Sequence, residues 1–451
     1  MAPSHFRALF LTSFLVAGCA PEEAPSLHNV VLVSIDTLRP DHMSLYGYPR
    51  ETTPFLDSLA AESVVFENAY AQANMTLISH MSMLTSLYPA AHGVEPPSSV
   101  LSGKAPYLPE LLKAAGYDTF GYYGLDWMSP KFGFGRGFDT YERQTEIEIE
   151  QGIESVLELL DARATQDRSF FLFLHLRDVH CRLGGGPGTP MYNAPAPFRD
   201  AFLPHPEVPV THRPKDVWEG TVKLSQAEAA NVVARYDGGI LYADEIVRRV
   251  VDRMRSLDLF DEALIVVTSD HGESLGQRGY FQSHGDYFEE GLRIPLLLKL
   301  PDAVPERERT RGVVATHTVQ SIDIAPTILR ANGIHVPATM QGTDLLDPRA
   351  RDVVAHSEAH KRSVLIRDSR KLFVRRGPKA SEELFDLASD PLELHPLGAR
   401  DSETLGELRA TLDRFLSRDG LVREQLSEAG TEPAELDDGE RERLKALGYL
   451  D

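Results

Sequence analysis

The sequence predicts an α/β fold in which helices sandwich a large, mostly parallel central sheet, followed by a small C-terminal subdomain of antiparallel sheet and helix. Three apolar, mostly β-branched or aromatic runs support the sheet: Asn29–Ile35, Phe170–Leu176 and Ala263–Thr268. Strands that are buried on both faces show such continuous runs, which are typical of parallel sheets. Helical patterns alternate with these runs until about residue 355, where the pattern changes to short strands and a helix.

The connecting segments complete this organisation. Helical patterns occupy residues 54–62, 108–115 and 147–164, and two helical stretches flank the YDGG sequence at 236–239 within residues 224–257. Residues 182–222 are rich in Gly, Pro and His and predict a long loop. A loop of that length is usually functional or mobile.

Polar residues with metal-binding and nucleophilic chemistry stand at the ends of these elements. Asp36 follows the first apolar run, and Asp270 and His271 follow another. The carboxyl ends of parallel strands meet at one edge of a doubly wound sheet, where ligands bind. Thr76 lies just ahead of a short, amphipathic helical run, and a helix start suits an anionic group. The alternative is that Thr76 only caps this helix.

Bulk properties exclude one class of function. The chain has 451 residues, enough for one large or two medium domains, and its formal net charge is −21. Such a charge argues against nucleic-acid binding through the overall electrostatic field. A local basic pocket can still hold an anionic substrate, because salt screens fields beyond about 8–10 Å.

The N-terminus predicts export and a lipid anchor. Residues 1–19 combine a weakly basic start with an apolar stretch that is too short to span a membrane. The sequence VAGC at 16–19 resembles a bacterial lipobox, so Cys19 becomes the lipidated first residue and residues 20–28 a tether. We expect anchoring to a bacterial membrane, in the periplasm or at the cell surface; the alternative is a plain cleaved signal peptide. Cys181 is the only other cysteine, so no intrachain disulfide is expected.

Several sequence blocks, taken together and in order, resemble the sulfatase family of the alkaline-phosphatase superfamily. The resemblance covers about residues 29–416 and implies a catalytic domain at 29–355, a C-terminal subdomain at 356–417 and a charged tail at 418–451. The blocks are SIDTLRPDH (34–42), YGY (46–48), TTP (52–54), SMLTSLYP (82–89) with HG (92–93), TSDHGESLG (268–276), IDIAPT (322–327), and ELFDL (383–387) with DP (390–391).

This resemblance implies a divalent cation bound by Asp36, Thr76, Asp270 and His271. Carboxylate oxygen and imidazole nitrogen are suitable ligands for hard or borderline cations. Thr37 stands where the family often places a second Asp. The cation is calcium or magnesium if the site is sulfatase-like, and zinc or manganese if it is like relatives that use Thr. The alternative is that Asp36 and Asp270 only cap the helices that follow them.

The nucleophile is the main departure from the family pattern. Sulfatases carry Cys or Ser in a Cys/Ser-x-Pro-Ser/Ala-Arg signature, and an accessory enzyme oxidises that residue to formylglycine. Here Thr76 occupies the nucleophile position, Ile78 the Pro position and His80 the Arg position. Threonine is not expected to undergo that oxidation. The family's sulfate-binding Gly-Lys-Trp-His block is also missing, and YYGLD at 122–126 stands about there.

The remaining site predictions concern substrate contacts and proton transfer. We expect helix N–H groups near Ser79 and His80 to bind the anionic group of the substrate. His180, in Asp-Val-His, and His284, in Ser-His-Gly, are expected to stabilise or protonate the leaving oxygen; the alternative for each is an ordinary loop histidine. His92 and His175 are expected to serve structural hydrogen bonds.

Three functions remain open for an anionic ester substrate. Thr76 favours a phosphoesterase, phosphodiesterase or headgroup transferase, because a threonyl ester must be cleared by attack at phosphorus or sulfur. The family resemblance favours a sulfatase that works without formylglycine. The third possibility is a surface-anchored binding protein with a degenerate site, against which the retained Asp36, Asp270 and His271 argue.

Overall fold

The structure is a computed structural model that describes residues 27–97, 99–144, 149–182, 184–281, 287–302, 311–428 and 433–446. The predicted signal peptide with Cys19 lies outside these ranges, as does His284. Among the described residues, no helix is both long and apolar enough to cross a membrane.

An eight-stranded sheet forms the centre of the molecule, in the order β4-β3-β5-β1-β6-β7-β2-β8. Only β7 runs antiparallel to its neighbours, so the prediction of a mostly parallel sheet is confirmed. The strands are β1 (Asn29–Ile35), β2 (Val64–Tyr70), β3 (Asp118–Tyr123), β4 (Thr140–Arg143), β5 (Phe170–Leu176), β6 (Ala263–Thr268), β7 (Arg293–Lys299) and β8 (Val313–Gln320).

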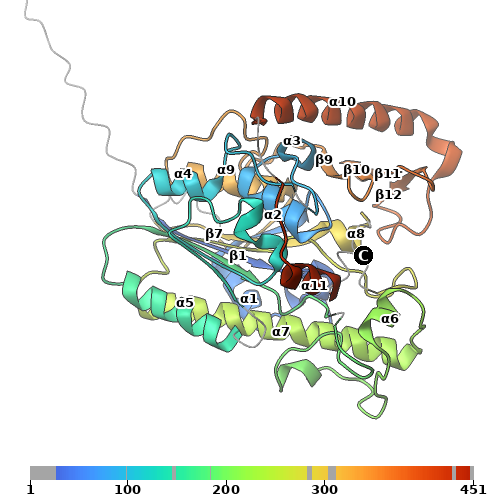
Figure 1. The fold of residues 1–451 in the computed structure, drawn as a ribbon, viewed down its shortest axis with the longest axis horizontal. Helices are drawn as coiled ribbons and strands as arrows, with labels where there is room; N and C mark the ends of the chain where they lie inside the picture. The colour runs from blue at the N-terminus through green and yellow to red at the C-terminus, as the bar shows by residue number, and fades with distance from the viewer. Residues whose placement is uncertain are drawn as a thin grey trace, which may run out of the picture.

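Helices cover both faces of this sheet (Figure 1). On one face lie α2 (Thr76–Thr85), α4 (Leu108–Ala114) and α9 (Ile324–Ala331); on the other lie α1 (Pro54–Leu59), α5 (Ile149–Arg163) and α7 (Gln226–Ser256). Alternate residues of β1 enter the two cores: Val30 packs on the α2 side and Val31 on the α7 side. Burial on both faces explains why the strands appear as continuous apolar runs.

Helix α7 differs from its prediction. The sequence predicts two helical stretches separated at YDGG, whereas one helix runs through 31 residues. Its glycines serve close packing instead of a break: a Cβ at Gly238 would lie 2.5 Å from the Phe198 carbonyl oxygen, and one at Gly239 would lie 2.9 Å from that of Asp178. Contacts that short exclude any larger residue, and they bring α7 against the segment that follows β5.

Helix α2 also differs, because it is buried along its whole length and is not amphipathic. The sheet lies beneath it, and α3 (Pro89–His92) and α9 pack around it. The polar residues Ser79, His80 and Ser82 are therefore fully buried and need partners inside the protein.

The C-terminal part forms the predicted antiparallel subdomain, with strand order β12-β11-β10-β9. Its strands are β9 (Val353–Ser357), β10 (Arg362–Arg367), β11 (Arg370–Arg375) and β12 (Ser381–Asp386). Helix α10 (Ser402–Leu426) packs on it through Leu408 and Leu412 and extends beyond residue 417 (Figure 1). Strand β9 lies across the predicted boundary at 355, so the small sheet begins earlier than the sequence predicts.

A buried charge cluster joins the two sheets. Lys371 of β11 is fully buried, and its Nζ lies 2.9 Å from Glu393 Oε1 and 3.1 Å from Glu289 Oε1. Glu289 begins α8 (Glu289–Leu292), directly before β7, and its N–H donates to Glu393 Oε2 at 2.6 Å. The cluster therefore fixes the subdomain against the central sheet.

We expect Lys371→Met to lower the free energy of unfolding by about 3–5 kcal/mol, because it leaves the buried Glu393 carboxylate without its cation. Urea denaturation of the purified protein measures this change. Lys379→Met, at an exposed position, is the control and should change it by less than about 0.5 kcal/mol. Equal effects of the two substitutions would contradict a stabilising role for the cluster.

Candidate active site

The carboxyl ends of β1 and β6 bring the predicted metal ligands together. Ser34 pairs with Thr268 in the parallel register, so Asp36 and Asp270 follow at neighbouring positions. Asp36, Asp270 and His271 are fully buried, and one ligand atom from each lies within 4.8 Å of the others. The expectation that these strand ends meet at one edge is confirmed.

Thr76 faces this cluster from the start of α2. Met75, not Thr76, precedes the helix as its capping position, and no side chain caps the first turn. The Thr76 hydroxyl oxygen lies 3.4 Å from His271 Nε2. The alternative in which Thr76 only caps the helix therefore does not describe this arrangement.

The carboxylates of the cluster are poorly satisfied by the protein itself. Within the described part of the chain, both oxygens of Asp36 and Oδ2 of Asp270 are buried and make no hydrogen bond. A buried carboxylate in that state is costly unless a cation or donor compensates it. His271 Nδ1–H donates to the Gly272 carbonyl oxygen at 2.8 Å, which leaves the lone pair on Nε2. Carboxylate oxygens and an imidazole nitrogen in this arrangement fit a divalent cation.

The hydrogen-bond donors of Ser79 and His80 are directed at protein atoms, whereas the sequence predicts that N–H groups near them bind the substrate. The Ser79 N–H donates to Met75 O at 2.9 Å and its hydroxyl to Asp270 O at 2.6 Å. Both ring nitrogens of His80 face protein atoms, with Nδ1 2.9 Å from Thr76 O and Nε2 2.9 Å from Ser34 Oγ. The hydrogen-bonding groups near Ser79 and His80 are thus used to position the helix. The N–H groups of its first turn are better placed to receive an anion.

His180 lies just beyond β5 and is almost fully buried. Its Nδ1–H donates to the Cys181 carbonyl oxygen at 2.6 Å, which leaves the lone pair on Nε2. Burial lowers the pKa of His180 to about 4, although the Asp36 carboxylate opposes this shift. The side chain is therefore neutral at pH 7. His284 lies outside the described residues.

Two tyrosines that support the site, Tyr236 and Tyr192, give no signal in the sequence. The Tyr236 hydroxyl of α7 donates to Thr37 O at 2.8 Å and accepts from Arg39 N at 3.0 Å. It thereby supports Thr37, whose φ of 58° is unusual for a β-branched residue. Tyr192 donates to Glu273 Oε2 at 3.0 Å, so the segment at 182–222 reaches the motif that carries Asp270. Burial raises the pKa of Glu273 to about 8.

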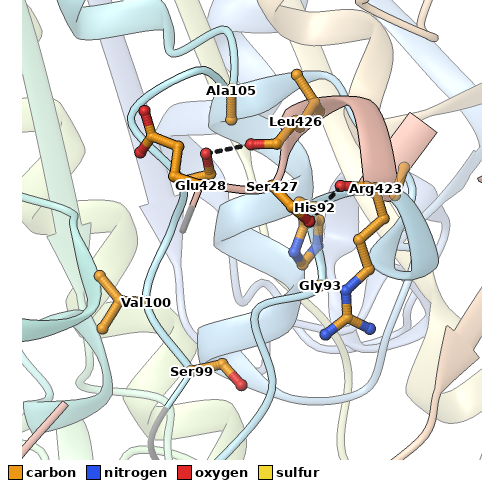
Figure 2. Close-up of a pocket in the computed structure, with 11 residues that line it drawn as sticks. His92, Gly93, Ser99, Val100, Ala105, Arg423, Leu426, Ser427 and Glu428 are labelled. Atoms are coloured by element: carbon orange, nitrogen blue, oxygen red, sulfur yellow. Dashed lines mark hydrogen bonds between the residues drawn. The ribbon is translucent and has the colours of Figure 1, made fainter. Parts of the chain in front are cut away.

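A pocket lies apart from this cluster, between α3 and the end of α10 (Figure 2). Its volume is about 190 Å³, and its lining includes His92, Gly93, Arg423 and Glu428. Of the described residues predicted to act in catalysis or metal binding, none lines it. Buried Asp and His side chains at the carboxyl edge of a parallel sheet, facing the Thr76 hydroxyl, are typical of an α/β enzyme with a cation site.

Comparison with known proteins identifies the family. A family model described as Sulfatase matches residues 28–334, and one described as N-sulphoglucosamine sulphohydrolase, C-terminal, matches residues 276–418. The chain therefore belongs to the sulfatase family of the alkaline-phosphatase superfamily and is a hydrolase that acts on ester bonds.

Individual relatives have low sequence identity to this chain but align with most of its length. An ulvan-active sulfatase of Formosa agariphila is 25% identical over 447 residues, covering 88% of this chain and 83% of that protein. The multifunctional alkaline phosphatase superfamily protein PehA of Trinickia caryophylli is 27% identical over 396 residues, covering 70% and 76%. A solved structure in complex with its substrate D-glucosamine-2-N,6-O-disulfate has a TM-score of 0.66 and 18% identity, covering 90% of this chain and all of that one.

The unsatisfied carboxylates lead to a prediction about stability. We expect Asp36→Asn to raise the free energy of unfolding in the presence of EDTA by about 1–3 kcal/mol, because it removes an uncompensated buried charge. Added Mn²⁺ or Zn²⁺ should stabilise the wild-type protein by about 2.7 kcal/mol at a hundredfold excess over its Kd, and the variant far less.

Thermal and urea denaturation with and without the cation measure both effects. Asp167→Asn, at an exposed position, is the matched control and should behave as the wild type does. A variant that is destabilised in EDTA, or that keeps the full response to the cation, would contradict the assignment of Asp36.

Proposed function

We propose that this protein hydrolyses an anionic ester with a bound divalent cation and with Thr76 as the nucleophile. The observation that carries this proposal is the position of the Thr76 hydroxyl oxygen, 3.4 Å from His271 Nε2 and beside a buried Asp cluster. Asp36, Asp270, His271 and Thr76 would hold the cation. Bound there, it would lower the pKa of the hydroxyl and polarise an ester oxygen.

The side chains supply the remaining chemistry. Thr76 Oγ forms a bond to phosphorus or sulfur as the bond to the leaving alcohol oxygen breaks. The leaving oxygen takes a proton from His180 or His284, the two histidines predicted for this role, while the Thr76 hydroxyl proton passes to solvent and solvent restores the histidine's proton. The N–H groups of the first turn of α2 stabilise the charge on the anionic group. Attack of water at phosphorus or sulfur then frees Thr76.

The nucleophile supports phosphoester or phosphodiester chemistry. A formylglycine hydrate can expel sulfate by breaking its own C–O bond, whereas threonine cannot, so its ester must be opened at the central atom. Phosphorus accepts such an attack in the superfamily's Thr-dependent members. The description of the PehA relative as multifunctional is consistent with a family site that serves more than one ester.

Sulfate-ester hydrolysis without formylglycine is the second candidate. It is favoured by the names of the relatives, among them the ulvan-active sulfatase. Turnover of aryl phosphate monoesters, phosphodiesters and sulfate esters by the purified mature protein, with and without Mn²⁺, Zn²⁺, Ca²⁺ or Mg²⁺, separates the two. A protein that neither binds a cation nor turns over any of these esters would instead support a degenerate binding protein.

Removing the nucleophile tests the mechanism. We expect Thr76→Ala to lower kcat/KM by at least about 10³-fold, on the scale of other nucleophile deletions, and Thr76→Ser to retain most of it. Steady-state kinetics on the best ester substrate measure the loss. Thr85→Ala is the matched control on the same helix. Its hydroxyl donates to Met81 O and accepts from the Leu87 N–H, so the substitution should lower stability and leave kcat/KM unchanged. Full activity in Thr76→Ala would rule out this nucleophile.

We also propose that Cys19 anchors the protein to a bacterial membrane. The basis is the VAGC sequence at 16–19, followed by a short Pro- and Glu-rich tether. The wild-type protein should fractionate with membranes and carry a labelled fatty acid, and Cys19→Ser should lose the label. Export of both forms as free protein would support the plain signal peptide.

A further inference from the structure

Two buried histidines lie directly behind the candidate cation site. His80 comes from α2 and His175 from β5; both are essentially inaccessible to solvent, with ring centroids 5.0 Å apart and ring planes at 89°. His80 Nδ1 lies 3.6 Å from Asp270 Oδ2, and His175 Nε2 lies 3.5 Å from Asp36 Oδ2. Each of the two carboxylates proposed to bind the cation thus has an imidazole nitrogen within 3.6 Å. His80, His175 and Asp270 are also close enough together to suggest a second cation site.

The hydrogen bonds of His80 determine where its proton lies. The Thr76 carbonyl oxygen, 2.9 Å from Nδ1, can only accept, so Nδ1 carries the hydrogen. Nε2 then accepts from the Ser34 hydroxyl at 2.9 Å. The nitrogen that faces Asp270 is therefore an N–H group and has no lone pair for a cation.

His175 has the opposite tautomer, with the same result. The Gly124 N–H donates to its Nδ1 at 3.1 Å, so Nδ1 carries the lone pair and Nε2 the hydrogen. The nitrogen that faces Asp36 is again an N–H group. At 3.5–3.6 Å the contacts with the carboxylates are electrostatic rather than formed hydrogen bonds.

We propose that His80 and His175 are positioning residues that orient the Asp270 and Asp36 carboxylates toward one cation, and that this edge of the sheet holds a single cation. Their N–H groups attract Oδ2 of each carboxylate, and Asp270 Oδ2 also lies 3.4 Å from His271 Nε2, so this attraction holds it beside another predicted cation ligand. His80 additionally ties the nucleophile's own carbonyl to β1 through Ser34. The inference rests on the cation site of the proposed function.

The test is cation affinity, measured separately from turnover and stability. The purified mature protein and its variants are titrated with Mn²⁺ and with Zn²⁺, and bound metal is counted by elemental analysis. His175→Leu removes the N–H group and should weaken affinity by about 10–100-fold, as loss of a residue behind a ligand does. His175→Gln places an N–H near the former Nε2 and should restore affinity to within about threefold. One ion per chain is expected for every form that binds.

His92→Leu is the matched control. His92 is also a buried histidine, held by Ser82 Oγ at 3.1 Å and the Val94 N–H at 3.0 Å, and burial lowers its pKa to about 3. The His92→Leu variant should lose thermal stability as His175→Leu does, but it should keep the wild-type affinity for the cation. This difference separates a role at the site from a general loss of packing.

Three results would overturn the inference. Affinity of His175→Leu equal to that of His92→Leu would remove the positioning role. If the wild-type chain binds two ions and His175→Leu binds only one, the histidines are ligands of a second ion and not positioning residues. A wild-type chain that binds no divalent ion would defeat this inference together with the cation site of the proposed function, whereas the first two results leave the proposed function intact.

Discussion

The parallel pairing of β1 with β5 on one side and β6 on the other controls the whole candidate site. Ser34 lies beside His175 on β5 and Thr268 on β6, and this register places Asp36 beside Asp270 two residues later. Side chains alternate along a strand, so a slip of one residue would turn Asp36 to the opposite face, away from α2. The register is fixed by two cores at once, because Val30 and Val31 are buried on opposite faces.

This arrangement places polar chemistry where the protein can least satisfy it. Asp36 and Asp270 are fully buried, and the described residues leave three of their four oxygens without a hydrogen bond. Their cost to stability is tolerated because the surrounding sheet and helices are extensively packed. The same desolvation strengthens any interaction with a cation or an anionic ester. The buried carboxylates thus lower the stability of the fold, and the same burial strengthens the binding of a cation or an anionic ester beside them.

The supporting contacts come from segments that are far apart in the sequence. Tyr236 of α7 supports Thr37, Tyr192 of the segment at 182–222 holds Glu273, and Ser79 of α2 donates to Asp270 O. These contacts hold the groups that surround Thr76 at defined distances, which proximity in catalysis requires. The C-terminal subdomain is fixed to the same sheet through Lys371 and α8. The segment at 182–222 and the C-terminal subdomain are therefore both joined to the sheet that carries the candidate site.

Much of the fold could be predicted because local pattern and burial agree. The apolar runs of β1, β5 and β6 have the bounds observed in the structure, since strands buried on both faces leave a clear signal. The edge strands β4 and β8 gave no such signal, because their residues are largely exposed or half-buried and apolar residues do not form a continuous run in either strand. The glycines in α7 suggested a break, although packing against Phe198 and Asp178 is what requires them.

The sequence by itself determined the family, the mostly parallel sheet and the convergence of Asp36, Thr76, Asp270 and His271, because strand ends and ordered motifs carry that information locally. Only the tertiary structure decided that α2 is buried all around and that Ser79 and His80 face inward. The tertiary structure also places His175 next to Asp36, because the partner of a buried histidine depends on which strands become neighbours. Packing between segments far apart in the sequence determines which strands become neighbours, and residue spacing within the chain does not predict it.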